Sequence, residues 1–293
     1  MRVLVTGAGG YVGGAAVEAL RDAGHEPVPF AGDVLDAAAV RDAVAGVAGV
    51  VHLAALSRVR EADADPERCR RVNVGGTEVV LGALEAAAAR RGTPLRLVLA
   101  SSAAVYGKAR EVPIPETAAV APLGPYAASK ADAERAVAAR VGDRLGAVVL
   151  RIFNAAGAAG GRGDGDATRL VPRVLAVAAG TAPQLEVNGD GRAVRDYVHV
   201  RDVGDAVPLA LDAARPGTHA VFNLGATPAS VLDVVAAAER VTGRPVPVVH
   251  LPRNPGEAPD LRADTTAART RLGWVARRSA LDELVAGQWA VTG

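Results

Sequence analysis

Short runs rich in Val, Leu and Ile alternate with Ala-rich amphipathic stretches throughout the first half of the chain. This alternation is typical of βαβ units, in which parallel strands are buried on both faces by the helices that connect them. Five such strands with crossover helices predict an α/β fold with a Rossmann-like, doubly wound parallel sheet. The predicted strands are Arg2–Thr6, Glu26–Phe30, Gly49–Leu53, Leu95–Ser101 and Ala147–Phe153, and the predicted helices are Tyr11–Ala23, Ala37–Ala45, Glu67–Arg90 and Tyr126–Val141.

The pattern changes beyond the fifth predicted strand. A Gly-rich stretch at Gly157–Gly165 is followed by a predicted helix at Thr168–Ala179 and by short strands separated by Pro, Gly and Asn. The length of 293 residues also suggests about two domains. We therefore expect a first domain over residues 1–154, completed by a strand and a helix around residues 195–225. A smaller C-terminal α/β region within residues 155–293 is expected to be interleaved with it.

Charge and cysteine content exclude several classes of function. The 33 basic residues nearly balance the 32 acidic ones, so nothing in the bulk charge recruits nucleic acid or an anionic membrane. The single cysteine, Cys69, excludes an intrachain disulfide, and no Cys/His cluster has the spacing of a metal site. The glycines within Val3–Leu20 argue against a secretory signal, and no stretch is apolar for long enough to span a membrane. These features favour a cytoplasmic protein with a small-molecule partner and no metal.

The segment TGAGGYVG directly follows the first predicted strand. It places Gly7, Gly10 and Gly13 at a strand-to-helix turn, where glycine allows a pyrophosphate to approach the backbone and the N-terminus of the next helix. Val12 makes the spacing GxxGxxG rather than GxGxxG. An ordinary tight turn is the alternative, but the position at the start of a βαβ pattern favours dinucleotide binding.

A tyrosine and a lysine are spaced one helical turn apart in Tyr126-Ala-Ala-Ser-Lys130. On a helix the two side chains share a face, and a nearby ammonium favours the phenolate, so the tyrosine becomes a candidate general base. The chain has only one other lysine, Lys108, which makes an idle surface lysine the weaker alternative. Ser101 and Ser102 end a predicted strand at the edge where parallel sheets present their chemistry, although serines there also start turns without any function.

These segments together resemble the extended branch of the short-chain dehydrogenase/reductase superfamily, and in particular its NAD-dependent sugar-nucleotide epimerases. The similarity covers nearly the whole chain, and several strings in the right order are more specific than any one of them. The strings are TGAGGYVG at 6–13, VVHLAA at 50–55, NVGGT at 73–77, SSAAVYG at 101–107, YAASK at 126–130, RIFNAAG at 151–157, RDYVHVRD at 195–202 and PGEAPDLRADTTAARTRLGW at 255–274.

The resemblance implies a role for each matching residue. Ser102, Tyr126 and Lys130 would be catalytic, with Lys130 holding the nicotinamide ribose, and Asn154 and Arg195 would contact the sugar nucleotide. Arg195 also offers a fork of donors suited to a diphosphate, although an ion pair at a strand edge is the alternative. The implied cofactor contacts are Gly7, Gly10, Tyr11, Val12, Gly13, Asp33, Val34, Leu53, Ala54, Ala55, Asn73, Tyr126 and Lys130. The implied substrate contacts are Ser102, Asn154, Arg169, Leu170, Asn188, Arg195 and Arg253.

Several positions depart from that family's pattern, and one of them is Ala104, which replaces a threonine in the SSAAVYG string. Asn254 follows Arg253 where the epimerases often have a second arginine, Asn188 replaces an aromatic residue beside the base, and Arg169 replaces a smaller polar residue. Ser57 stands where some members place a lysine on the cofactor phosphates. These departures leave the nucleotide and the sugar open.

The segment after the second predicted strand is shortened. The strand ends at Phe30-Ala31-Gly32 and Asp33 follows at once, with no arginine nearby. Because NADP sites usually have an arginine here and Asp33 would repel the extra phosphate, we expect NAD.

The resemblance implies C4 epimerisation of a nucleoside-diphosphate sugar, of the UDP-glucose/UDP-galactose type, through a transient 4-keto intermediate. A nucleotide-4-ketosugar reductase would use the same Tyr and Lys, and a non-catalytic dinucleotide sensor would need neither. A 4,6-dehydratase is disfavoured by Ala103-Ala104, because that relative has an Asp/Glu pair there. A homodimer is left open.

Overall fold

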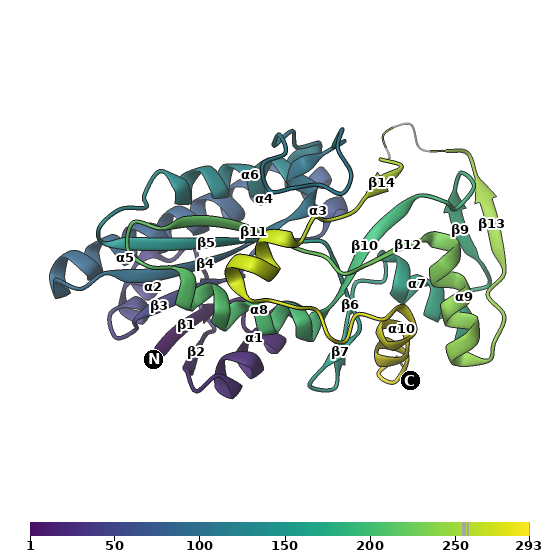
Figure 1. The fold of residues 1–293 in the computed structure, drawn as a ribbon, viewed down its shortest axis with the longest axis horizontal. Coiled ribbons are helices and arrows are strands. Elements are labelled where there is room, and N and C mark those ends of the chain that lie inside the picture. The colour runs from purple at the N-terminus through teal and green to yellow at the C-terminus, as the bar shows by residue number, and fades with distance from the viewer. Residues whose placement is uncertain (254–255, 257, 293) are drawn as a thin grey trace.

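In the computed structural model, which describes residues 1–253, 256 and 258–292, a six-stranded parallel sheet forms one half of the molecule (Figure 1). The strand order β11-β5-β4-β3-β1-β2 confirms the predicted doubly wound α/β fold. Five strands were expected in the first half of the chain, and a sixth joins them from the second half, because β11 pairs with β5. The strands are β1 Arg2–Thr6, β2 Glu26–Phe30, β3 Gly49–His52, β4 Leu95–Ser102, β5 Leu145–Ile152 and β11 His219–Leu224.

Helices cover both faces of this sheet, as a buried parallel sheet requires. On one face α1 (Tyr11–Asp22) packs against α8 (Val200–Ala213), and their apolar side chains join the strands in one core cluster. On the other face α2 (Ala37–Val44), α5 (Gly76–Arg91) and α6 (Gly124–Ala138) form a second cluster with the same strands. The near-continuous Val/Leu/Ile runs of the strands follow from this burial on both sides.

Strand β2 forms one edge of the sheet and pairs only with β1. Its sequence contains Pro27 and Pro29, which have no N–H to donate to a further strand. Prolines at an edge strand also prevent pairing with another chain. The sheet therefore ends at β2, and the segment that follows it is exposed at Ala31, Gly32 and Asp33.

The prediction of a single helix over Glu67–Arg90 is wrong in one respect, because the structure has two α-helices there with a π-helical turn between them. Helix α4 (Pro66–Arg70) is followed by one turn of π-helix at Arg71–Gly75 and then by α5. A π turn widens the helix and turns the side chain at its centre, and such turns are frequent at functional sites. The side chain concerned is Asn73, which lies in the predicted NVGGT string.

The second region has its own core. Strand β10 (Val194–His199) pairs with β6 (Asn154–Ala156), β12 (Thr227–Ser230) and β14 (Asp260–Leu261), while β9 (Leu185–Asn188) pairs with β13 (Val248–Leu251). Helices α7 (Leu170–Ala178), α9 (Val231–Thr242) and α10 (Leu281–Trp289) bury apolar side chains with these strands in a third cluster. Figure 1 shows this region at the opposite end of the molecule from β3 and β4.

One buried carboxylate joins the C-terminal segment to helix α8. Asp202 is fully buried and accepts hydrogen bonds from the backbone N–H groups of Arg277 and Arg278 and from the Ser279 hydroxyl. Arg278 adds an ion pair at 3.0 Å. Buried carboxylates require such partners, so the segment before α10 is held firmly against the first region. No helix among the described residues is long and apolar enough to span a membrane.

Candidate active site

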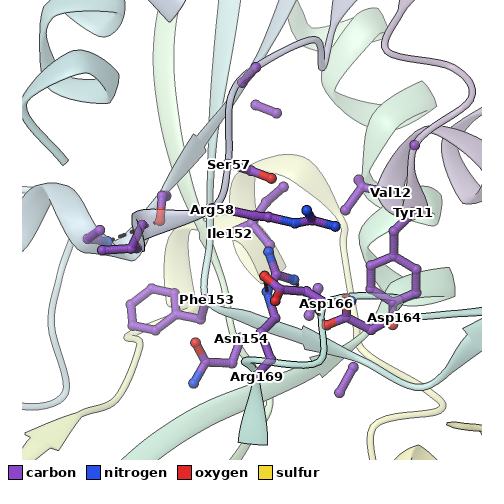
Figure 2. Close-up of a pocket in the computed structure, with 18 of the residues that line it drawn as sticks. Tyr11, Val12, Ser57, Arg58, Ile152, Phe153, Asn154, Asp164, Asp166 and Arg169 are labelled. Atoms are coloured by element: carbon purple, nitrogen blue, oxygen red, sulfur yellow. Dashed lines mark hydrogen bonds and ion pairs between the residues drawn. The ribbon is translucent and has the colours of Figure 1, made fainter. Parts of the chain in front are cut away.

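A large cavity lies between the two regions, beside the carboxyl ends of the sheet strands. It measures about 1180 Å³ and is lined by residues of both regions, including Gly7, Tyr126, Asn154 and Arg195. Figure 2 shows part of this lining, with Tyr11 and Asn154 among the labelled residues. Pockets for a single small molecule usually span roughly 300–1,000 Å³. The cavity is therefore larger than is usual for one small molecule.

The Gly-rich turn forms one wall of the cavity. Gly7 has a φ of 69°, and a Cβ added there would lie 2.7 Å from the backbone nitrogen of Ala54. A Cβ at Gly13 would lie only 2.0 Å from the carbonyl oxygen of Gly7. Gly10 precedes α1 and provides no side-chain cap, so the first N–H groups of the helix remain available to a ligand. The turn therefore has the shape of an anion cradle that larger residues would fill.

Ser102, Tyr126 and Lys130 lie together at the cavity wall. Ser102 ends β4, and Tyr126 and Lys130 stand one turn apart near the start of α6. The Ser102 hydroxyl accepts from the backbone N–H of Ala104 at 3.2 Å, and Ser102 lies near enough to Tyr126 to lower the pKa of its phenol. The Lys130 Nζ atom donates to the carbonyl oxygen of Ala100 at 2.9 Å, which fixes the lysine under the end of the strand.

Burial governs the protonation of this pair. Loss of solvent raises the pKa of Tyr126, and the neighbouring Ser102 side chain opposes this rise only in part. Burial lowers the pKa of Lys130 to about 8. Desolvation therefore outweighs the effect expected of a nearby ammonium on the phenol, and the Lys130 ammonium is directed to the carbonyl oxygen of Ala100.

A buried polar network lies behind the cavity wall. The Asn73 side chain accepts from the backbone N–H of Leu56 at 2.7 Å and donates to its carbonyl at 3.1 Å. It also donates to the Ser129 hydroxyl at 2.9 Å, and Ser129 in turn donates to the carbonyl of Tyr126 at 2.7 Å. Asn73 therefore connects the loop after β3 to the helix that carries the tyrosine.

A histidine continues this network toward the Gly-rich turn. The His52 ring lies between the hydroxyls of Thr6, at 2.7 Å, and Thr77, at 3.2 Å. Burial, together with the charge of Lys130, lowers the pKa of His52 to about 3, so its ring is neutral. Thr6 also accepts from the backbone N–H groups of Leu53 and Ala54. The turn after β1 and the loop after β3 are thus held together.

A buried ion pair anchors the other side of α6. Arg151 on β5 donates to both carboxylate oxygens of Glu134, at 2.7 Å to the nearer one, and both side chains are over nine-tenths buried. Ser101 donates to Glu134 at 2.5 Å, and Arg151 also donates to the Tyr106 hydroxyl at 2.9 Å. Glu134 lies one turn after Lys130 on α6, so this cluster fixes the register of the helix against β4 and β5.

Most residues predicted to bind cofactor or substrate lie around the cavity. Those that line it are Gly7, Gly10, Tyr11, Val12, Gly13, Leu53, Ala54, Ala55, Ser102, Tyr126, Lys130, Asn154, Arg169, Leu170 and Arg195. Those that do not are Asp33, Val34, Asn73, Asn188 and Arg253.

These five have other surroundings. Asp33 is exposed after β2, Val34 is buried below it, and Asn73 belongs to the network behind the wall. Asn188 and Arg253 are exposed at the ends of β9 and just beyond β13, outside the cavity. Asn254 lies outside the described residues.

Motif analysis missed several charged residues that line the cavity. Arg58, Arg162, Asp164 and Asp166 belong to no recognised string, and they are brought together by the loops after β3 and after β8 (Arg162–Gly163). Arg169 pairs with Asp164 at 3.2 Å and with Asp166 at 3.5 Å. Figure 2 shows Arg58, Asp164, Asp166 and Arg169 among the side chains that line the cavity. The Gly-rich stretch 157–165 was the only signal in the sequence for Arg162, Asp164 and Asp166, and none pointed to Arg58.

Tyr11, in the first turn of α1, connects the Gly-rich turn to the second region. Its hydroxyl donates to the carbonyl of Gly157 at 2.6 Å, and burial raises its pKa, so it remains a neutral donor.

Among the described residues, no group of His, Cys, Asp and Glu has an arrangement that could hold a metal ion.

Comparisons with known proteins agree on one family. Residues 3–225 match the model of the NAD dependent epimerase/dehydratase family. A UDP-glucose 4-epimerase from Corynebacterium glutamicum is 36% identical over 322 residues, which cover 100% of this chain and 96% of the relative. One from Streptomyces lividans is also 36% identical, and the match covers 98% of this chain and 95% of that protein.

Solved structures give the same result. The UDP-glucose 4-epimerase from Stenotrophomonas maltophila, with bound NAD and formylated UDP-arabinopyranose, is 31% identical with a TM-score of 0.91, covering 100% of this chain and 98% of that one. The enzyme from Brucella ovis in complex with NAD is 33% identical with a TM-score of 0.90, covering 99% of this chain and 98% of that one.

Proposed function

This chain belongs to the NAD dependent epimerase/dehydratase family, and we propose that it is an NAD-dependent C4 epimerase of a UDP-sugar of the UDP-glucose/UDP-galactose type. The observation that carries the proposal is the placement of Ser102, Tyr126 and Lys130 in the same cavity as the Gly-rich turn. Full-length relatives named UDP-glucose 4-epimerase and NAD-bound structures of similar fold support it.

The residues present fit a dinucleotide. The positions of Gly7 and Gly13 leave a cradle that a Cβ would fill, and the uncapped start of α1 offers N–H groups to a pyrophosphate. Lys130 has three N–H donors, and with one on Ala100 it retains others for the ribose hydroxyls. When bound, NAD would accept a hydride from C4 of the sugar and return it.

The side chains of the protein would then handle the proton. For this step Tyr126 would act as the phenolate and take the proton of the C4 hydroxyl as the hydride leaves C4, with the neighbouring Ser102 as the proposed relay, and the 4-keto sugar would form. Asn154, Arg169, Leu170 and Arg195 line the substrate side of the cavity. The cavity volume of about 1180 Å³ allows the ketone to turn so that its other face is presented.

We assign cofactor binding to residues 1–154 completed by α8 and β11, and substrate binding mainly to the interleaved residues 155–293. The pairing of β11 with β5 and the packing of α8 on α1 support this division. Asn188 and Arg253 are proposed to reach the nucleotide only if β9 and β13 close over it, because both are exposed outside the cavity.

The exposed end of the cofactor site after β2 favours one rival, a 4-ketosugar reductase that exchanges its cofactor in every turnover. Incubation of the purified protein with UDP-glucose or UDP-galactose, without added cofactor, tests the proposal by NMR. We expect inversion at C4 without a net change in absorbance at the NADH maximum, and release of NAD on acid denaturation. Stoichiometric consumption of a reduced cofactor with a 4-ketosugar would establish the reductase instead.

A further inference from the structure

The charged side chains that line the cavity differ in the hydrogen bonds and ion pairs that they make. Six cationic and two acidic side chains line it among the described residues: Arg58, Arg60, Lys130, Arg162, Arg169, Arg195, Asp164 and Asp166. Lys130 is directed to Ala100, and Arg169 pairs with both acids. Arg58, by contrast, pairs with Glu61 at 2.9 Å, and both side chains are about half exposed.

The backbone brings Arg58 close to the Gly-rich turn. Gly7 and Ala54 approach so closely that a Cβ on Gly7 would collide with the backbone of Ala54, and the Thr6 hydroxyl accepts from the Ala54 N–H. Arg58 lies four residues further along the same loop, directly before α3 (Val59–Ala64). Figure 2 shows its side chain extending into the cavity in the direction of Val12 and Tyr11, at the start of α1.

We propose that Arg58 binds the diphosphate of the dinucleotide cofactor, and this rests on the proposed use of NAD. The guanidinium presents a planar fork of donors that matches phosphate oxygens, and it faces the helix start where the diphosphate of a dinucleotide lies. Ser57, the residue before it, carries no charge. Arg58 therefore supplies a cation on the side of the cavity opposite α1.

The neighbouring charges explain why this arginine remains available. Asp164 and Asp166 both pair with Arg169, and their charges act on Arg58 only as secondary influences, because its direct ion pair is with Glu61. The ion pair of Arg58 with Glu61 is exposed to water, and such pairs are weak and easily exchanged. An entering diphosphate replaces Glu61 as the partner of Arg58, and the fork then makes charge-assisted hydrogen bonds.

The test measures binding of the cofactor in the absence of any sugar. Protein freed of bound nucleotide is titrated with NADH, ADP-ribose and adenosine for the native chain and for Arg58→Ala, Arg58→Lys, Arg60→Ala and Arg68→Ala. Arg68→Ala removes the same charge from an exposed position on α4 that does not line the cavity. Loss of a hydrogen bond to a charged group predicts that Arg58→Ala raises the Kd for NADH and ADP-ribose roughly 10- to 100-fold.

Adenosine has no phosphate, so its Kd is expected to be the same in all variants. Arg58→Lys is expected to retain part of the affinity, and the salt dependence of NADH binding is expected to be shallower in Arg58→Ala than in the native chain. Equal NADH affinity in Arg58→Ala and Arg68→Ala would overturn the proposal, as would a larger loss in Arg60→Ala. The assay of C4 inversion uses only the native chain, so failure of the proposed function would be seen separately.

Discussion

The two ends of the proposed dinucleotide site are built differently. At the catalytic end, Tyr126 and Lys130 stand on a helix held by the buried Glu134–Arg151 ion pair and by the hydrogen bonds of Asn73. At the other end, β2 is an edge strand, and the residues that follow it are exposed to solvent up to Asp33. Many tertiary contacts fix the end with Tyr126 and Lys130, whereas the end after β2 is largely open to solvent.

The difference indicates which part of the site requires exact positions of its side chains. Proton transfer requires positions correct to a fraction of an ångström, and such precision comes from side chains locked by packing and hydrogen bonds. In the proposed function the adenosine half would lie at the open end and contribute only affinity, so this end would change how long the cofactor stays rather than what it does. Substitutions at the catalytic end are therefore expected to have much larger effects than those at the open end.

The largest effect is expected for Tyr126→Phe. Only a hydroxyl is lost, so the fold and the affinity for NADH should be retained, while loss of general base catalysis should lower kcat by about 10²- to 10⁴-fold. Steady-state kinetics, with thermal unfolding and NADH titration as controls, check this. A variant with near-native turnover would exclude Tyr126 as the base.

Asn73→Ala is expected to be the most destabilising of these changes. It leaves the buried N–H and carbonyl groups of Leu56 without their side-chain partner and breaks the connection to Ser129. Unsatisfied buried groups predict a loss of about 2–4 kcal/mol in the free energy of unfolding. Urea denaturation measures this, with the exposed Asn188→Ala as the matched control, for which a change within about 0.5 kcal/mol is expected. Equal values for the two variants would contradict the role given to the network.

Lys130 predicts a pH dependence of stability for the cofactor-free protein. Burial lowers the pKa of Lys130 to about 8 in the folded state, whereas the unfolded chain has the ordinary value near 10.4, so the unfolded state binds more protons between these two pH values. Stability should therefore rise with pH across this window, by about 2 kcal/mol from pH 8 to pH 10. Denaturation of the native chain and of Lys130→Met at both pH values isolates this contribution. If the difference in unfolding free energy between the native chain and Lys130→Met were the same at pH 8 and pH 10, Lys130 would not be desolvated in the folded state.

The hydrophobic pattern of the sequence predicted those strands whose ends are set by neighbouring residues. The bounds of β1 and β2 agree with the prediction, because each apolar run ends at small or Gly-containing segments. The break in the helix at Arg71–Gly75 could not be predicted, since the π turn accompanies tertiary hydrogen bonds of Asn73 with Leu56 and Ser129. The sixth strand was expected only as a completion around residues 195–225, because its place depends on a pairing with β5 that spans a long stretch of chain.

The candidate site divides in the same way. Gly7, Tyr126 and Lys130 were found because their chemistry depends on spacing within one turn or one helix. Arg58 and Asp164 were missed because they meet only when two distant loops face the same cavity. The sequence also favoured a lowered pKa for Tyr126, but the desolvation that raises it depends on packing that no local pattern reveals.

Asp33→Asn probes the open end and is expected to have the smallest effect. The Asp33 carboxylate accepts from the backbone N–H of Leu35 at 2.9 Å, an exposed contact that an asparagine oxygen can keep, so the turn should persist. If solvent screens this charge as its exposure implies, the Kd for NADH should change less than about threefold and the Kd for NADPH should fall by less than about tenfold. Parallel titrations of both cofactors, with the exposed Asp42→Asn on α2 as the control, measure this. A loss of NADH affinity above tenfold would instead make Asp33 a direct ligand of the adenosine half, and the contrast between the two ends would have to be abandoned.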